Sequence, residues 1–185
     1  MSRFLCMATA VWIAALTGAV GAQTASSVPA PAPAQKVRIG VFDSRMVALA
    51  YYNSDEHRKF TQDLMAQLKA AKAANDTARI SDLEFRGPAL QNLMHYQVFS
   101  NASIPNVMDK LAPELPRVAA EARVPVIVSK WDVAFHDPDV EYVDVTDALV
   151  RAFKPNEKVQ KWVDEGRTKA PIPLLEAVMT LRPAR

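Results

Sequence analysis

Three histidines are the side chains in this sequence that most readily act as metal ligands or general bases. His57, His95 and His136 lie far apart, and none forms the His-x-x-x-His pair that puts two imidazoles on one helix face. The single cysteine, Cys6, lies close to the N-terminus and cannot complete a metal cluster with them. We therefore expect no metal and no cofactor.

Two short polar motifs also invite a chemical interpretation. Ser129 precedes Lys130, but neighbouring strand residues point to opposite faces, so the lysine is not placed to take the serine proton. The run 136–141, His-Asp-Pro-Asp-Val-Glu, is rich in oxygen ligands but lacks the glycine turn and the spacing of a calcium loop. We interpret the two motifs as a solvated strand end and a polar loop. Without a nucleophile, base and orienting group, the sequence predicts that the protein is not an enzyme.

The overall charge is nearly balanced. The 185 residues include 22 Lys and Arg against 20 Asp and Glu. Proteins that bind nucleic acids concentrate basic residues on one face or tail, so this balance argues against DNA or RNA as a partner. One cysteine cannot make a disulfide framework within a single chain. The fold must therefore be held together by packing or by assembly.

The first 22 residues have the pattern of a secretory signal peptide. Arg3 precedes an apolar stretch that closes with small residues up to Ala22. An uncleaved membrane anchor is the alternative, which these closing small residues disfavour. Residues 23–35 alternate proline with small residues and predict an extended linker. We expect cleavage after Ala22 and a mature protein outside the cytoplasm.

The first elements expected after Lys36 are a strand, a short helix and three longer helical segments. Residues 37–41 alternate as a strand does, and Asp43-Ser44 can cap a helix over 46–51. Apolar residues recur every four positions over 55–75, which predicts an amphipathic helix of about five turns. A second helical segment over 80–94 contains Gly87-Pro88, which should kink or break it. A third, over 104–122, has coiled-coil spacing, but Pro113 and Pro116 argue against a long straight helix.

The last third of the chain returns to strand patterns. Segments 126–128, 133–135 and 140–145 are rich in β-branched residues and predict three short strands. Thr146 is expected to cap a helix over 147–153, and Asn156 a helix over 157–165 that ends at Gly166. The final twenty residues include Pro171 and Pro173 and are expected to pack as an extended tail.

Strands from both ends of the chain must pair across the helices that separate them. We therefore predict an α+β fold, in which a small β body formed from both ends of the chain carries a projecting, arm-like helical insertion at 54–122. The body and insertion together span residues 36–153. Residues 154–185 are expected to add a C-terminal helix and the extended tail.

Two patches of the sequence resemble the Skp/OmpH family of periplasmic chaperones. The first is 37–47, Val-Arg-Ile-Gly-Val-Phe-Asp-Ser-Arg-Met-Val, which is similar to the family's opening strand and the helix that leads to its arm. The second is 119–153, which contains Trp131, Phe135 and the run 143–150, Val-Asp-Val-Thr-Asp-Ala-Leu-Val, similar to the closing strands and terminal helix. The resemblance implies a homo-oligomer, a trimer, built around the β body with helical arms emerging from it.

The resemblance also implies a function. Members of the family are periplasmic, ATP-independent holdase chaperones or assembly factors, whose partners are unfolded outer-membrane or secreted proteins. The alternative is a non-enzymatic structural or adaptor protein of the cell envelope that binds one folded partner. The family's arms are typically basic, whereas residues 55–122 contain 8 basic and 9 acidic side chains, which argues against contact of the arms with an anionic membrane surface.

Two sets of side chains are candidates for these roles. Met94, Tyr96 and Phe99 form a cluster that could either grip unfolded apolar segments or close the arm's own core. The oligomer contacts and core of the β body are assigned to six residues of the strand regions: Val37, Ile39, Val41, Ile127, Trp131 and Phe135. For the aromatic residues of the body, packing or subunit contact is the default interpretation and a ligand pocket is the alternative.

Overall fold

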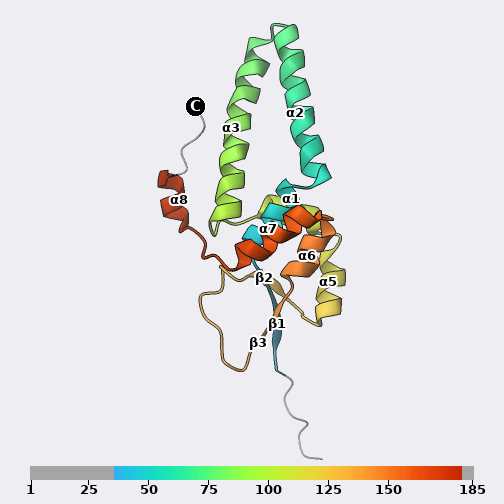
Figure 1. Ribbon diagram of the computed structural model, residues 1–185, viewed down its shortest axis with the longest axis vertical. Helices are drawn as coiled ribbons and strands as arrows, with labels where there is room; N and C mark the ends of the chain where they lie inside the picture. The colour runs from blue at the N-terminus through green and yellow to red at the C-terminus, as the bar shows by residue number, and fades with distance from the viewer. Residues whose placement is uncertain (1–35, 181–185) are drawn as a thin grey trace, which may run out of the picture. The chain divides into compact units, whose positions relative to one another are not determined.

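The computed structural model describes residues 36–180, so the predicted signal peptide and linker lie outside the described residues. Helices and a small sheet are combined in one body, which confirms the predicted α+β class (Figure 1). The elements in chain order are β1 (Arg38–Phe42), α1 (Ser44–Tyr52), α2 (Asp55–Ala73), α3 (Thr77–Phe99), α4 (Pro105–Leu111), α5 (Leu115–Ala122), β2 (Ile127–Ser129), β3 (Glu141–Asp144), α6 (Thr146–Ala152), α7 (Glu157–Arg167) and α8 (Leu174–Thr180).

The three strands form one parallel sheet in the order β2-β1-β3. Gly40 of the central strand lies opposite Ile127 on one side and Val143 on the other. A Cβ atom added at Gly40 would lie 3.0 Å from side-chain atoms of both Val124 and Ile127, so glycine permits this close approach. Strands from the two ends of the chain therefore pair across the intervening helices, as the sequence predicted.

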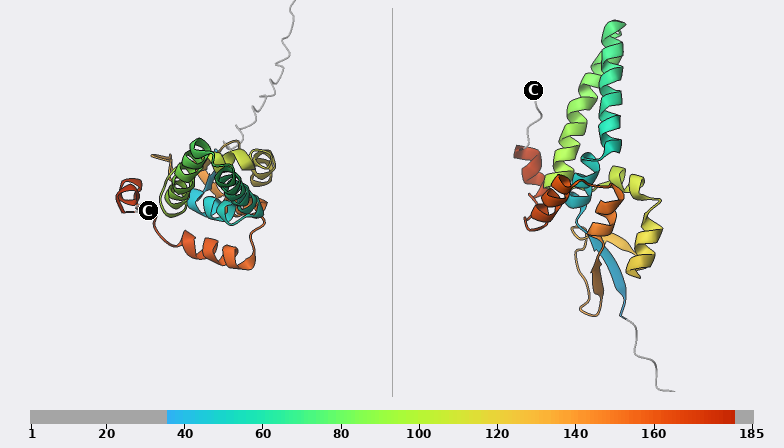
Figure 2. Two further views of the ribbon diagram at one scale, coloured as in Figure 1. Left: turned by 90° about the horizontal axis from the view of Figure 1, so that it is seen from above. Right: turned by 45° about the vertical axis from the view of Figure 1, so that its right-hand side comes forward.

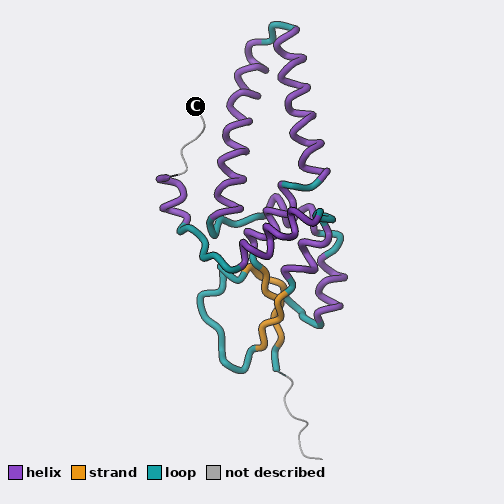
Figure 3. Tube along the Cα trace, in the orientation of Figure 1, coloured by secondary structure: helices purple, strands orange, loops and turns teal. Residues whose placement is uncertain are grey.

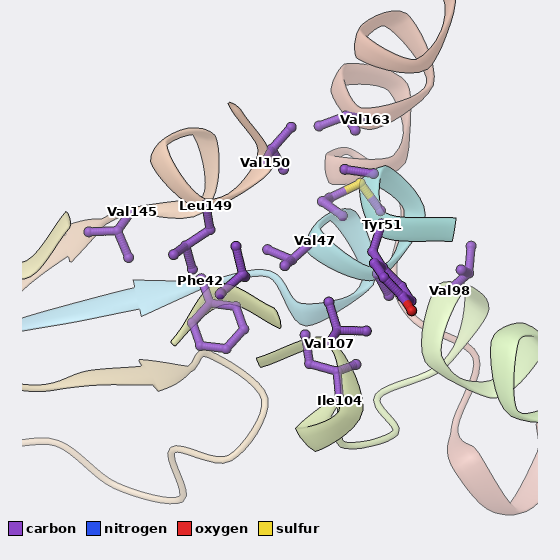
Figure 4. Close-up of a cluster of buried hydrophobic side chains, with 14 of the residues drawn as sticks. Phe42, Val47, Tyr51, Val98, Ile104, Val107, Val145, Leu149, Val150 and Val163 are labelled. Carbon is purple, nitrogen blue, oxygen red and sulfur yellow. The ribbon is translucent and has the colours of Figure 1, made fainter. Parts of the chain in front are cut away.

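α1 connects the sheet to the helices. Asp43 caps it, as predicted, by accepting a hydrogen bond from the backbone N–H of Arg45. Seven of its nine residues are buried, which is typical of a helix surrounded by other elements. Those elements are α2, α3, α4, α6 and α7. Figure 4 shows Val47 and Tyr51 of α1 among core side chains that come from β1, α4, α6 and α7.

α2 and α3 form an antiparallel helix pair that extends from this body, and we call it the arm (Figure 1, Figure 2). Between the two helices, Asn75 adopts a φ of 53°, a left-handed conformation that asparagine tolerates better than most residues. Asp76 then caps α3 by accepting a hydrogen bond from the N–H of Arg79. The predicted helix over 55–75 is thus confirmed as α2.

α3 continues through Gly87-Pro88, so the expected break at this pair does not occur. Pro88 has no N–H to donate to the carbonyl of Glu84 four residues earlier. Glu84 and Pro88 are exposed, so water can satisfy that carbonyl and the helix is maintained.

The segment over 104–122 forms two short helices, α4 and α5, and not one long coiled coil, in agreement with the prediction from its prolines. Its apolar repeat faces the core of the body, where Ile104, Val107, Leu111 and Val118 are buried. The predicted insertion at 54–122 is therefore helical, but only α2 and α3 project as the arm.

The segment 133–135, predicted as a strand, lies in the loop that joins β2 to β3 (Figure 3). Because β2 and β3 occupy both sides of β1, this loop has to pass from one edge of the sheet to the other. Phe135 is 83% exposed there and has no strand to pair with. The prediction of a strand at 133–135 is wrong because an apolar run alone does not supply a pairing partner.

The helices after the sheet begin as expected but differ in detail. The hydroxyl of Thr146 accepts a hydrogen bond from the backbone N–H of Asp43, so it does not cap α6, whose N-cap is Val145. Asn156 caps α7, as predicted, but the helix passes through Gly166. A Cβ atom added at Gly166 would lie 2.6 Å from the end of the buried Met46 side chain. Glycine is therefore needed here for packing and does not end the helix.

The C-terminal segment is not extended throughout. Residues 168–173 cross to the base of α3, where the N–H of Ile172 donates a hydrogen bond of 2.9 Å to the carbonyl of Phe99. Residues 174–180 then form helix α8, which contacts α3. The prediction of an extended tail is therefore wrong for α8, because Pro171 and Pro173 precede the helix and do not interrupt it.

Candidate functional site

An apolar groove lies between the two helices of the arm. Its volume is about 450 Å³. The large apolar side chains that line it are Phe60, Leu64, Met65 and Leu68 from α2, and Leu83, Leu90 and Met94 from α3. We call this groove the arm groove; its mainly apolar lining could hold an apolar ligand.

The sequence places one apolar stripe on each helix of the arm. Phe60, Leu64 and Leu68 recur every four residues on α2, so they share one face. Facing stripes on paired helices normally interdigitate and bury each other. Here Phe60 is 45% exposed and Met65 66% exposed, and a Cβ atom added at Gly87 of α3 would touch nothing within 4 Å. The two stripes therefore remain partly unpartnered.

The arm is closed at its tip, near the turn between the helices. The Arg79 guanidinium donates a hydrogen bond of 2.6 Å to the side-chain oxygen of Gln67. Lys72 and Glu84 form an ion pair of 2.8 Å across the two helices. Leu83 is buried in the same region. The helices thus meet at the tip and diverge toward the body, as Figure 1 shows.

The base of the arm is fixed by a buried polar network. Gln97 of α3 accepts a 2.6 Å hydrogen bond from the Tyr52 hydroxyl of α1 and donates a 2.7 Å bond to Asn106 of α4. The Gln97 side chain is buried, so these bonds are shielded from water. An ion pair of 2.9 Å between Glu56 and Lys110 adds a link from α2 to α4. The groove is thus held open between a closed tip and an anchored base.

His57 lies where the arm groove meets the body. Its ring is perpendicular to the Tyr52 ring at 4.8 Å between centroids and lies 5.3 Å from the Tyr51 ring. Its Nδ1 atom is buried and accepts or donates no hydrogen bond. Burial lowers the pKa of His57 below its ordinary value, because an imidazolium would lose hydration there. His57 is therefore held neutral at neutral pH.

Acidification is expected to destabilise the fold through His57. Below about pH 6.5 the unfolded chain binds a proton at this histidine more readily than the folded chain does. The free energy of unfolding should therefore decrease as the pH falls from that value through the lower pKa of the folded state. Urea unfolding of the wild type and of His57→Phe at about pH 7.5 and pH 5.5 tests this. The substitution should reduce the pH dependence of the free energy of unfolding, and an equal pH dependence in the two proteins would contradict this role of His57.

The carboxyl end of the sheet carries a second cluster of interacting side chains, centred on the buried Asp43. Arg45 contacts both carboxylate oxygens of Asp43, at 3.1 and 2.8 Å. Lys130 Nζ lies 2.8 Å from Asp43 Oδ2, and the Trp131 indole N–H donates to Oδ1 at 3.2 Å. Arg45 and Lys130 also lie over the Trp131 ring, at 4.9 and 4.4 Å from its centroid. We call these four residues the Asp43 cluster.

The Asp43 carboxylate is fully occupied. Burial opposes its charge, but the hydrogen bonds and charges of Arg45 and Lys130 outweigh that effect and lower the pKa of Asp43. With the backbone N–H of Arg45 included, five donors address its two oxygens, which leaves no lone pair for a substrate. The cluster therefore fixes the start of α1 and the end of β2.

The residues predicted to bind clients are not brought together. Met94 lines the arm groove, but Tyr96 and Phe99 do not. Side chains two and five positions further along a helix are rotated by about 200° and 140°, so the three residues point in different directions. Sequence reasoning does not identify Phe60, Leu64 and Met65 as site residues; the four-residue repeat on α2 contains Phe60 and Leu64 but not Met65.

The six residues assigned to the β body differ in burial. Ile127 packs against the core, and Ile39, Val41 and Trp131 are half-buried. Val37 and Phe135 are exposed. Their role in subunit contact stays a prediction, since the structure describes a single chain.

The other candidate residues lie apart from both sites. His95 lies beside Phe99 on α3, and His136 beside Tyr142 of β3. Between residues 36 and 180, no three His, Cys, Asp or Glu side chains are grouped so that they could hold a metal ion. No helix in that same range is long and apolar enough to cross a membrane.

Comparisons with protein-family models, curated proteins and solved structures find no match for this chain. What the arm groove does has to be inferred from its own residues.

Proposed function

We propose that the protein is a periplasmic, ATP-independent holdase chaperone or assembly factor, which binds unfolded outer-membrane or secreted proteins in the arm groove. The observation that carries the proposal is the groove itself: an open apolar surface between two helices whose ends are both fixed. Exposed apolar surface of this kind is unfavourable in water unless a partner covers it.

The groove is suited to clients that are apolar but have no common sequence. Met65 and Met94 line it from opposite helices, and methionine side chains adapt to ligands of different shapes. Its lining contains no charged carboxylate or ammonium group that would demand a matching charge on the client. Binding would gain about 25 cal/mol for each Å² of apolar surface removed from water, so affinity would follow the apolar area of the client.

The location and assembly in this proposal have separate support. The signal-peptide pattern of residues 1–22 and the resemblance of 37–47 and 119–153 to the Skp/OmpH family favour the periplasm. The same resemblance favours a trimer, and the exposed Val37 and Phe135 of the body supply apolar side chains that subunit contacts could cover.

The proposal is tested by light scattering of the mature chain, residues 23–185, alone and after dilution of an outer-membrane protein from urea. A soluble complex that contains both proteins, together with reduced turbidity, is expected without ATP. An adaptor with one folded partner would neither form that complex nor reduce the turbidity, and this result would overturn the proposal.

A further inference from the structure

α8 packs on the arm with its smallest side chain. Ala177 is buried and the helix contacts α3, whereas Leu175 is 76% exposed and Met179 74% exposed. Leu174 and Val178 are also exposed. A helix that served only to cover α3 would turn its large apolar side chains inward, because their burial gives the greater stabilisation. α8 instead presents them to the outside.

The exposed apolar residues of α8 form one continuous face. With about 100° of rotation per residue, Leu174, Val178, Leu175 and Met179 follow one another within about 140° of the helix circumference. Glu176 and Thr180 lie beyond one edge of this face and Ala177 beyond the other. We call the four apolar residues the α8 face.

Basic residues flank the α8 face in the sequence. Residues 168–185 contain three basic side chains, Lys169, Arg182 and Arg185, against one carboxylate, that of Glu176. Residues 55–122, which include the arm, hold 8 basic and 9 acidic side chains and have no comparable excess. The occupant that matches both properties is an anionic lipid surface, because it offers acyl chains to the apolar face and phosphates to the basic flanks.

We propose that α8 is a peripheral anchor that lies in the plane of an anionic lipid bilayer. Seven residues rise only about 10 Å along a helix, so α8 can lie in the headgroup region but cannot cross the bilayer. The hydrogen bond from Ile172 to the Phe99 carbonyl ties the segment to the base of α3. The anchor therefore holds the arm beside the membrane. This inference concerns a surface outside the arm groove and does not depend on client binding there.

Sedimentation of the mature chain with phosphatidylglycerol vesicles, and with phosphatidylcholine vesicles as the neutral comparison, tests the anchor. We expect binding to the anionic vesicles that weakens as salt is raised. Leu175→Asp should weaken this binding at least about tenfold. Thr180→Asp adds the same charge to the same helix outside the α8 face, so it should have a much smaller effect.

Three results would overturn the proposal: no binding to anionic vesicles, an equal loss for Leu175→Asp and Thr180→Asp, or a decrease in the oligomer mass of Leu175→Asp, which would assign the α8 face to a second copy of the chain. The proposed chaperone function is separable, because Leu175→Asp should still protect an unfolded client. A chain that binds vesicles but protects no client would remove the chaperone proposal and leave the anchor in place.

Discussion

Replacement of Asp43 by asparagine is expected to lower the free energy of unfolding by about 3–5 kcal/mol, because it leaves the buried Arg45 guanidinium without its carboxylate partner. Lys130 would lose its partner as well, although its side chain is partly exposed and can be hydrated. Urea unfolding followed by circular dichroism measures the change. Glu141→Gln is the matched control, because its ion pair with Arg38 is half-exposed and contributes at most about 1 kcal/mol.

Asp43→Asn should also change how the free energy of unfolding depends on pH in acid. The pKa of Asp43 is lowered in the folded state, so its stabilising contribution is present above the unfolded pKa of about 3.9 and is lost as the pH falls through the lower folded value. Asp43→Asn should remove this part of the acid dependence. A variant that unfolds within about 1 kcal/mol of the wild type would show that the Asp43 cluster does not hold the sheet to α1.

Charges placed in the arm groove are expected to weaken client binding at least about tenfold. The double substitution Phe60→Asp and Met65→Asp puts two carboxylates on the groove wall, where a bound apolar segment would desolvate them. Phe60 is 45% exposed and Met65 66% exposed, so the stability of the fold should change less than it would for buried core residues. Fluorescence anisotropy of a labelled, urea-diluted outer-membrane protein gives the dissociation constant.

The control for this variant is Gln62→Asp with Ala66→Asp. It adds the same two charges to α2 at exposed positions that do not line the groove. It should bind the client as the wild type does. If both double variants lose affinity to the same extent, the effect is one of net charge and the groove is not the binding site.

Local patterns were sufficient to predict the elements that the chain encodes within a few residues. The alternation over 37–41 predicted β1, Asp43 and Asn156 were identified as caps, and the four-residue repeat predicted α2. In each case the signal and the structure it forms lie within one element. The order of these elements also predicted that strands from both ends of the chain pair and that helices between them project.

Features that depend on distant residues were not predictable in this way. Lys130 was interpreted as a solvated strand end, but it pairs with Asp43, which lies 87 positions earlier in the chain. The segment 133–135 has strand-like residues, yet both sides of β1 are already occupied. The capping role assigned to Thr146 failed because its hydroxyl bonds to the N–H of Asp43 instead. Tertiary contacts decided each of these cases.

The sequence predicted the type of site, an apolar surface on the helical arm, but not which residues form it. The sequence indicated apolar residues on a projecting helical arm, and Met94 belongs to the groove. Whether two apolar stripes close on each other depends on how the helices diverge, which the contacts of Gln67 with Arg79 at the tip and of Gln97 at the base determine. A single-helix pattern does not contain that information.

The most direct test of the account is site-specific photo-crosslinking from the arm to an unfolded client. A photoreactive phenylalanine derivative would replace Met65 inside the groove in one protein and Gln62 outside it in another. The groove position should crosslink strongly to a urea-diluted outer-membrane protein, and the outer position weakly. Equal crosslinking from both positions, or none from Met65, would contradict the claim that the arm groove holds unfolded proteins.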